Sequence, residues 1–230
     1  MFDDSAFPGI PLLRGVTALD IERLKLRFMP IRVSQGQCVV SLDDLERDVF
    51  FVLSGRLLAV HWTIDGREIV FSRIMPGSHL GEVSALDGKA RSISVYAQTD
   101  CELLRLDQAG FKTLVDRLPM VRDRVFANLC ALVRQLTQRA SEIQTQPVEG
   151  RLRLFLARIA LESRCLHRGG LIDPAPTHAE IANSIGANRE AVSRGLSALA
   201  RQGVLKTGRS KIRLLQPEAL MPEGVSLEPS

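Results

Sequence analysis

Short apolar runs alternate with turn residues between Ile31 and about Leu106. The turns fall at Ser34-Gln35-Gly36, Ser54-Gly55, Asp65-Gly66, Pro76-Gly77 and Asp87-Gly88. Asp65-Gly66 is the strongest hairpin signal, because it separates two strand-like runs, Leu57–Thr63 and Glu68–Phe71, and a two-residue type I′ turn needs positive φ. The regular spacing predicts a closed sandwich or barrel of short strands rather than a parallel sheet. Before it, Thr17-Ala18-Leu19-Asp20 resembles a capping box and predicts a helix to about Phe28, ended by Pro30.

After Asp107 the apolar pattern becomes helical. A short helix is expected around Phe111 and Leu114, ending at Pro119, and a long helix from Met120 to about Ile143. The long helix repeats an apolar residue about every 3.5 positions, at Leu129, Val133, Leu136, Ala140 and Ile143. Such a narrow stripe is typical of a coiled-coil seam and favours a homodimer, the alternative being packing onto the chain's own barrel. Gln144-Thr145-Gln146-Pro147 breaks the period and predicts a hinge.

The remainder predicts a winged helix-turn-helix. A helix from Val148 to about Leu161 is followed by a loop, Arg164–Pro176. Thr177 is placed to cap the next helix, Gly186 to make the tight turn, and Asn188 to cap a helix over Arg189–Arg201. A basic hairpin follows, with strands at Val204–Thr207 and Lys211–Leu215 joined by Gly208-Arg209-Ser210. From Pro217 onward we expect a mobile tail.

Composition is that of an ordinary soluble globular protein, with 45% apolar and 24% charged residues in 230. No apolar run approaches the roughly 18 residues of a membrane span, and the acidic start lacks the features of a secretory signal. We therefore expect a cytoplasmic protein without membrane contact. Neither the cysteines nor the histidines show metal-ligand spacing, so we expect buried, reduced thiols and no metal or haem. They are Cys38, Cys101, Cys130 and Cys165, and His61, His79, His167 and His178.

Charge is unevenly distributed along the chain. Residues 150–216 contain 12 Lys and Arg against 4 Asp and Glu, a net charge of +8, whereas residues 1–149 contain 18 against 19. A near-neutral first part joined to a basic second part suggests that one part senses a signal and the other binds a polyanion.

The helix predicted at Arg189–Arg201 has a polar face suited to reading DNA. Its outward positions are expected to hold Arg189, Glu190, Ser193, Arg194 and Ser197. Arg can bond both major-groove acceptors of guanine, and Glu can accept a bond from the cytosine amino group. In the following hairpin, Lys206, Arg209 and Lys211 are candidates for phosphate contacts.

The stretch from Gly81 to Ser92 combines the groups that a cyclic nucleotide needs. Gly81 allows close backbone approach, and a short helix follows whose N-terminus attracts phosphate. Glu82 can accept a bond from the ribose 2′-hydroxyl, and Arg91, next to Ser92, can bind the cyclic phosphate. The alternative is a surface hairpin with a solvated Glu and Arg.

In this order, these elements resemble the bacterial catabolite-activator/fumarate-nitrate regulator (CRP/FNR) family of dimeric transcription factors. Two segments carry the resemblance: Gly81-Glu82-Val83 with Arg91-Ser92, which is similar to the phosphate-binding cassette of cyclic-nucleotide receptors, and Arg189-Glu190-Ala191-Val192-Ser193-Arg194, which is similar to the R-E-x-x-x-R recognition helix. The resemblance implies an α+β protein with an N-terminal double-stranded β-helix or jelly-roll barrel, a dimerisation helix and a C-terminal winged helix-turn-helix. The expected boundaries are 1–118, 119–146, 147–217 and a tail over 218–230.

The resemblance also implies roles for individual residues. Glu82 would hold the ribose, Arg91 and Ser92 the phosphate, and Arg189, Glu190 and Arg194 the bases. The full expected ligand set is Ala59, Phe71, Ser72, Ile74, Gly81, Glu82, Val83, Arg91, Ser92, Leu136 and Thr137, and the expected DNA set is Thr177, Asn188, Arg189, Glu190, Ser193, Arg194, Lys206, Arg209 and Lys211.

Two positions depart from the family pattern. Where cyclic-AMP-specific members place a Thr-Ser pair against the base, this chain has Leu136-Thr137, and Leu136 cannot bond the adenine amino group. Pro147 replaces the family's hinge aspartate. We therefore expect a cyclic-AMP-responsive homodimer that binds two-fold symmetric DNA and RNA polymerase, with cyclic GMP as a further ligand. The alternatives are a regulator gated by another signal or by none, and an enzyme, for which no catalytic motif is present.

Overall fold

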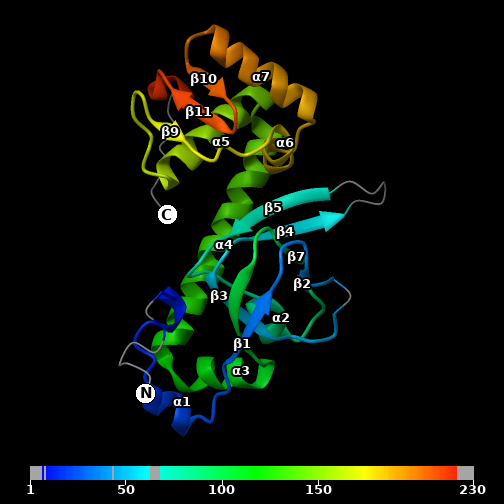
Figure 1. Cartoon of the computed structure of the whole chain (residues 1–230), viewed down its shortest axis with the longest axis vertical. Coiled ribbons are helices and arrows are strands. Elements are labelled where there is room, and N and C mark those ends of the chain that lie inside the picture. Colours follow the sequence, from blue (N-terminus) through cyan, green and yellow to red (C-terminus); the bar gives the residue numbers. More distant parts are fainter. Residues whose placement is uncertain (1–6, 8, 43, 63–67, 222–230) are drawn as a thin grey trace. The chain divides into compact units, whose positions relative to one another are not determined.

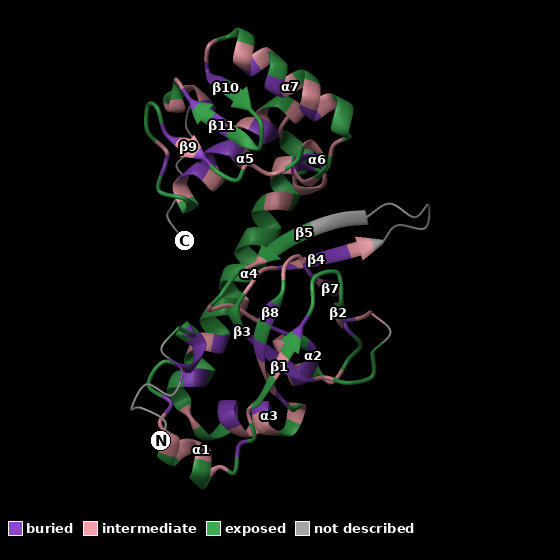
Figure 2. Cartoon of the chain, viewed as in Figure 1, coloured by how far each residue is buried: buried purple, intermediate pink, exposed green. Residues whose placement is uncertain are grey.

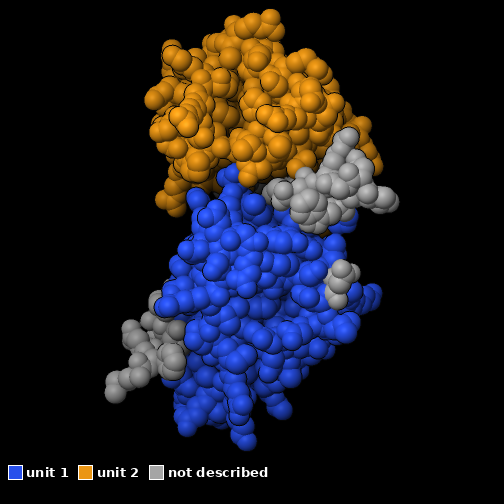
Figure 3. Space-filling model, turned by 45° about the vertical axis from the view of Figure 1, so that its right-hand side comes forward, with its two compact units in different colours: residues 1–133 blue, residues 134–230 orange. Residues whose placement is uncertain are grey.

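The computed structural model describes residues 7, 9–42, 44–62 and 68–221. The chain divides into two compact units, Met1–Val133 and Arg134–Ser230 (Figure 3). In the described part of the chain, no helix combines the length and apolar character that crossing a membrane requires.

The first unit begins with two short helical segments, η1 (Pro11–Leu13) and α1 (Ala18–Arg23). The predicted capping box is present, since the Thr17 hydroxyl accepts from the Asp20 amide and the Asp20 carboxylate accepts from the Thr17 amide. The helix does not reach Phe28 as predicted. It ends at Arg23 because the backbone turns at Lys25, whose φ of 51° is left-handed, and a strand begins at Met29.

In the described residues, strands β1 to β8 form the predicted sandwich, and Figure 1 shows their arrangement. One sheet has the order β1 (Met29–Val33), β8 (Cys101–Leu106), β3 (Val49–Ser54) and β6 (His79–Leu80), and the other β2 (Cys38–Val40), β7 (Ser94–Ala97), β4 (Leu57–Trp62) and β5 (Glu68–Ile74). All strand pairs are antiparallel, as expected of a jelly roll. Val52 and Leu103 of the first sheet form one core cluster with Leu57 of the second, so burial of these side chains holds the two sheets together.

The β4–β5 hairpin has the predicted pairing, with Leu57 opposite Ile74 and Ala59 opposite Ser72. Its predicted turn, Asp65-Gly66, lies outside the described residues.

Three helices accompany the sandwich: α2 (Glu82–Asp87), α3 (Gln108–Arg117) and α4 (Pro119–Thr145). The first turns of α4 pack into the core of the first unit through Val121 and Val125. Farther along, α4 is largely exposed (Figure 2). Its apolar side chains there include Val133, Ile143 and Leu136, which are 62%, 53% and 51% exposed. The alternative interpretation, packing of this helix onto the chain's own barrel, therefore accounts only for its N-terminal part.

The second unit contains the predicted winged helix-turn-helix. Its elements are α5 (Val148–Glu162), β9 (Leu171–Ile172), α6 (His178–Ile185), α7 (Arg189–Arg201), β10 (Leu205–Gly208), β11 (Lys211–Leu214) and η2 (Pro217–Leu220). Leu152, Ile181 and Leu196 from the three helices are buried in one core cluster. The segment expected to be a loop contributes β9, which pairs with β11 as the third strand of the wing sheet.

Two further expectations are wrong. Residues 217–221 are not a mobile tail, because Leu220 is fully buried and Arg153 Nη1 donates to Ala219 O at 2.7 Å. The cysteines are all free, but only Cys101 and Cys165 are buried. Cys38 is exposed because β2 is an edge strand, and Cys130 because the middle of α4 is open to solvent.

Candidate functional site

The Gly81–Ser92 segment forms a tight loop around α2. Gly81 has a φ of 94°, and a Cβ there would lie 2.5 Å from Asp48 O and 2.6 Å from Arg91 Nη1, so only glycine fits. Glu82 opens α2 and is partly exposed, while the Ser84 hydroxyl donates to Ala90 O at 3.3 Å and ties the helix to the returning chain. The sequence predicted that the Gly81 backbone approaches a ligand closely. In the structure it approaches the Arg91 side chain.

Arg91 is the most unusual side chain in this region. It is only 6% exposed, and its Nη2 and Nη1 donate to Asp48 O at 2.9 Å and to Gly81 O at 3.3 Å. Its Nε is buried without a hydrogen-bond partner, and no carboxylate among the described residues forms an ion pair with it. Burial lowers the pKa of Arg91, with the charges of Asp48 and Asp44 acting in the opposite direction. A buried cation held by carbonyl dipoles alone is a site that an anion would stabilise.

The other predicted pocket residues are distributed over the sandwich and α4. Ala59 is buried opposite the exposed Ser72 on the β4–β5 hairpin, and Ile74 packs partly against the core. Phe71, Val83 and Ser92 are exposed. Leu136 and Thr137 are exposed on the part of α4 that belongs to the second unit. The structure thus brings together Gly81 and Arg91, and separately Ala59 and Ser72.

Sequence reasoning missed two residues behind Arg91. Asp48, whose backbone carbonyl accepts from Arg91, is buried, and its carboxylate forms an ion pair with Arg105 Nε. A charged residue directly before the apolar run Val49–Val52 was a possible signal. Arg105 could not be found in this way, because it is 57 residues distant along the chain and meets Asp48 only through β3–β8 pairing.

In the second unit, the helix-turn-helix is fixed by its predicted caps and by one unpredicted arginine. Thr177 and Glu180 form a capping box on α6, with the Thr177 amide 2.7 Å from Glu180 Oε2. Gly186 makes the turn with a φ of 61°. Arg151 is buried on α5 and donates to Ile185 O at 2.6 Å, which satisfies a carbonyl at the C-terminus of α6. The turn between α6 and α7 is therefore held by a glycine and by a buried guanidinium, while Thr177 fixes the start of α6.

The α7 helix presents the predicted recognition face. The Asn188 side chain caps it by accepting from the Ala191 amide at 2.7 Å. Arg189, Glu190 and Arg194 are exposed, as predicted, and Ser193 is partly exposed, while Val192, Leu196 and Leu199 are buried on the opposite face. None of the three charged residues forms an ion pair with another described residue. Their side chains are therefore available to a ligand.

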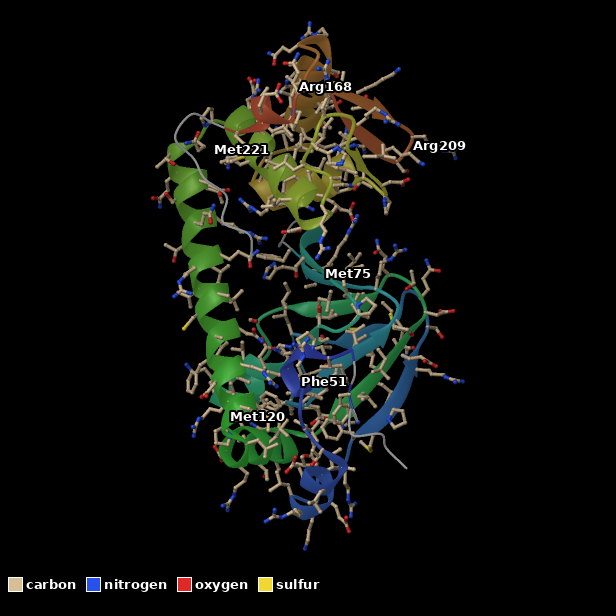
Figure 4. The ribbon with its side chains drawn as sticks, turned by 90° about the vertical axis from the view of Figure 1, so that its left-hand side faces the viewer. Phe51, Met75, Met120, Arg168, Arg209 and Met221 are labelled. Atoms are coloured by element: carbon tan, nitrogen blue, oxygen red, sulfur yellow. The ribbon has the colours of Figure 1, made fainter. Side chains whose placement is uncertain are left out.

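The wing places basic residues around its turn. Arg209 lies at the tip of the β10–β11 hairpin (Figure 4), next to Ser210, whose φ of 54° is left-handed. Lys206 and Arg209 are exposed. Lys211 is exposed as well, but its Nζ lies 2.8 Å from Asp173 Oδ2, so its charge is partly compensated within the chain.

A β-sandwich with a buried arginine beside a glycine-capped helix, joined to a winged helix-turn-helix, is the arrangement of a DNA-binding transcription regulator. Comparison with protein families agrees: the cyclic nucleotide-binding domain family matches residues 30–117, and the Crp-like helix-turn-helix domain family matches residues 150–222. The chain belongs to the CRP/FNR family of transcription regulators, whose members are not enzymes.

The relatives differ in the signals that their names record. The chain is 28% identical over 212 residues to the cyclic AMP receptor protein of Thermus thermophilus, covering 92% of this chain and 95% of the relative. It is 31% identical over 201 residues to the transcriptional regulator LdrP of the same species, an alignment that covers 86% of this chain and 98% of LdrP. Among solved structures, the c-di-GMP-responsive regulator CLP of Xanthomonas campestris has the same fold, with a TM-score of 0.67 at 22% identity. The superposition covers 85% of this chain and 97% of the CLP chain.

Proposed function

We propose that the protein is a homodimeric transcription regulator whose DNA binding is switched by cyclic AMP. The observation that carries this proposal is Arg91: a buried guanidinium whose Nε lacks a partner and whose terminal nitrogens are held by backbone carbonyls. The pocket would be part of an N-terminal domain over 1–118, followed by a dimerisation helix over 119–146 and a DNA-binding domain over 147–217.

The chemistry of the Gly81–Ser92 segment fits a cyclic phosphate attached to a ribose. Arg91 would supply a charge-assisted donor to the phosphate, aided by the exposed hydroxyl of Ser92. Glu82 is partly exposed at the start of α2 and can accept from the one ribose hydroxyl that a 3′,5′-cyclic phosphate leaves free. Ala59, Phe71, Ser72, Ile74 and Val83 would line the rest of the pocket.

The exposed stripe of α4 supports a dimer. Val133, Leu136 and Ile143 are all more than half exposed, and together with Leu129 and Ala140 they keep the 3-4 spacing of a coiled-coil seam. A second copy would cover these side chains. Thr137 would then contact the ligand of the partner subunit. Because Leu136 has no polar atom for the base, cyclic GMP is the second candidate ligand.

The second unit would read a two-fold symmetric DNA site, one half-site for each subunit. Arg189, Glu190 and Arg194 would reach base edges, with Ser193 beside them and Asn188 at the helix start. Thr177, Lys206, Arg209 and Lys211 would contact phosphates, and Lys211 would first exchange its bond to Asp173. RNA polymerase is the expected protein partner, with Leu161–Gly170 as its candidate contact, and the cytoplasm the expected location.

A regulator of the same fold that answers to another signal is the second candidate. Two observations favour it: the apolar Leu136 at the position of base recognition, and a structural neighbour that responds to c-di-GMP.

The decisive experiment measures affinity for a symmetric duplex with TGTGA-like half-sites at one salt concentration, without ligand and with cyclic AMP or cyclic GMP. We expect a large gain with cyclic AMP, and no gain in Arg91→Ala. Arg32→Ala is the matched control, because it removes an exposed arginine from the same sandwich. DNA binding that neither nucleotide changes would favour the second candidate.

A further inference from the structure

Asp48 connects the candidate phosphate site to the framework of the sandwich. Its backbone carbonyl accepts from Arg91 Nη2 at 2.9 Å, while its carboxylate pairs with Arg105 Nε. The carboxylate is 8% exposed. A buried carboxylate needs a partner of opposite charge, and Arg105 is the one that supplies it.

Arg105 holds the segment from Glu46 to Asp48 at two points. Besides Asp48, it contacts Glu46 through Nη2 at 3.2 Å. Arg105 itself lies on β8, which is paired on both sides, with β1 and with β3, and its own register partner on β3 is Phe50. The segment that ends at Asp48 is therefore fastened to a central strand of the sheet through one side chain.

The Asp48 carbonyl in turn helps to orient Arg91. A guanidinium is planar, so fixing Nη2 on Asp48 O and Nη1 on Gly81 O fixes the plane and the direction of the remaining Nε–H. Gly81 belongs to the candidate phosphate segment itself, whereas Asp48 lies outside it and depends on Arg105.

We infer that Arg105, acting through Asp48, is a positioning residue for nucleotide binding. This inference rests on the proposed function, since it assumes that Arg91 binds the cyclic phosphate. Arg105 touches no ligand in this account. It stabilises the carbonyl that presents Arg91, so its loss leaves Asp48 buried without its ion pair and the guanidinium less well oriented.

The test compares cyclic AMP affinity, measured by calorimetric titration, in the wild-type chain and three variants. Arg105→Gln removes the charge that Asp48 needs, and we expect affinity to fall about tenfold, the equivalent of one charge-assisted hydrogen bond. Arg105→Lys keeps the charge and should recover part of the affinity. Arg32→Gln is the control, because Arg32 on the adjacent strand β1 also forms an Nε ion pair, 3.1 Å from Glu102, but both partners are exposed. It should bind like wild type.

A double-mutant cycle separates positioning from a general loss of structure. Arg91→Lys weakens the phosphate contact and cannot be oriented by two carbonyls in the same way, so Arg105→Gln should have little further effect in that background. Equal fold-losses in both backgrounds would assign Arg105 a structural role and overturn the inference. So would an Arg105→Gln affinity equal to that of Arg32→Gln.

Two further results are separable from these. If wild type binds neither cyclic AMP nor cyclic GMP, the proposed function fails, and the inference fails with it. If Arg105→Gln does not fold, Glu46→Gln replaces it, because this exposed side chain contributes only the second contact of Arg105. The inference then requires a smaller but measurable loss of affinity, and wild-type affinity contradicts it.

Discussion

The Glu142 carboxylate lies 2.7 Å from the Arg158 guanidinium, so an ion pair joins the last turns of α4 to α5 across the predicted hinge. Both side chains are largely buried, at 15% and 22% exposure, and Gln138 Nε2 also donates to Glu142 Oε1 at 3.0 Å. Burial lowers the pKa of Arg139, and the like charge of the nearby Arg158 lowers it further. Glu142 thus compensates part of a locally cationic cluster at the junction of the two helices.

Removing the charge of Glu142 should loosen this junction. We expect Glu142→Gln to lower the free energy of local opening by about 1–3 kcal/mol. Arg158 then stays largely buried without its ion pair to Glu142, and Arg139 loses the compensating charge beside it. Hydrogen exchange of the α5 amides measures this change in the free energy of opening. Glu149→Gln is the control, since Glu149 forms an i,i+4 pair with Arg153 and is half exposed, and it should cost about 0.5 kcal/mol or less. Equal protection in both variants would contradict the prediction.

The sequence predicted best those elements whose determinants are local. The caps at Thr17, Thr177 and Asn188 are each made within three residues, and each forms as expected. The buried face of α7 likewise follows from its own periodicity. The two-residue β9 lacks such a signal, since it exists only because β11 pairs with it.

Long-range contacts explain the remaining differences. The burial of Leu220 depends on a core to which α5 contributes, and the Asp48–Arg105 pair depends on strand register. Helix α1 ends earlier than predicted because Lys25 adopts a left-handed backbone conformation. Lysine seldom adopts this conformation, and no residue nearby in the sequence predicts it. The candidate site was therefore predictable as a segment, Gly81 to Ser92, but not in the contacts that orient Arg91.

Position 136 provides a test of base selection. On the proposed function, Leu136 faces the base without a hydrogen-bonding group, so Leu136→Thr should raise the ratio of cyclic AMP to cyclic GMP affinity. Competition binding of both nucleotides to wild type and variant measures this ratio. Val133→Thr, which makes a similar change three residues earlier on the same exposed stripe, should leave it unchanged. A ratio that moves equally in both variants would indicate an effect on the dimer rather than on the base.

The two classes of basic residue in the second unit should behave differently on DNA. Arg194→Ala should cost about 1–3 kcal/mol on the preferred site and little on random duplex, because an exposed arginine on α7 is proposed to bond base edges. Arg209→Ala, at the tip of the wing, should weaken binding to both duplexes alike and reduce the salt dependence by about one phosphate contact. Binding titrations at several salt concentrations distinguish the two. Uniform loss in Arg194→Ala would reassign that residue to phosphate.

His79 should make the first unit less stable in acid. It lies on β6 next to the core aromatic Phe51, with 6.4 Å between ring centroids, and burial lowers its pKa below the ordinary value of 6.5, against the opposing charge of Glu82. Because the folded pKa is the lower one, the unfolded chain binds the proton more readily. The contribution of neutral His79 is therefore fully present above pH 6.5 and is lost as the pH falls through 6.5 toward the folded value.

The size of this effect is bounded by linkage. One group contributes a slope of at most about 1.4 kcal/mol per pH unit to the free energy of unfolding. Denaturant unfolding between pH 7.5 and 5.5, followed by hydrogen exchange of the β3 and β8 amides, measures the slope for the first unit. His79→Phe preserves an aromatic ring against Phe51 and should flatten the slope, whereas His167→Gln, an exposed residue of the second unit, should leave it as in wild type. If His79→Phe kept the wild-type slope, the acid sensitivity would have to come from other groups.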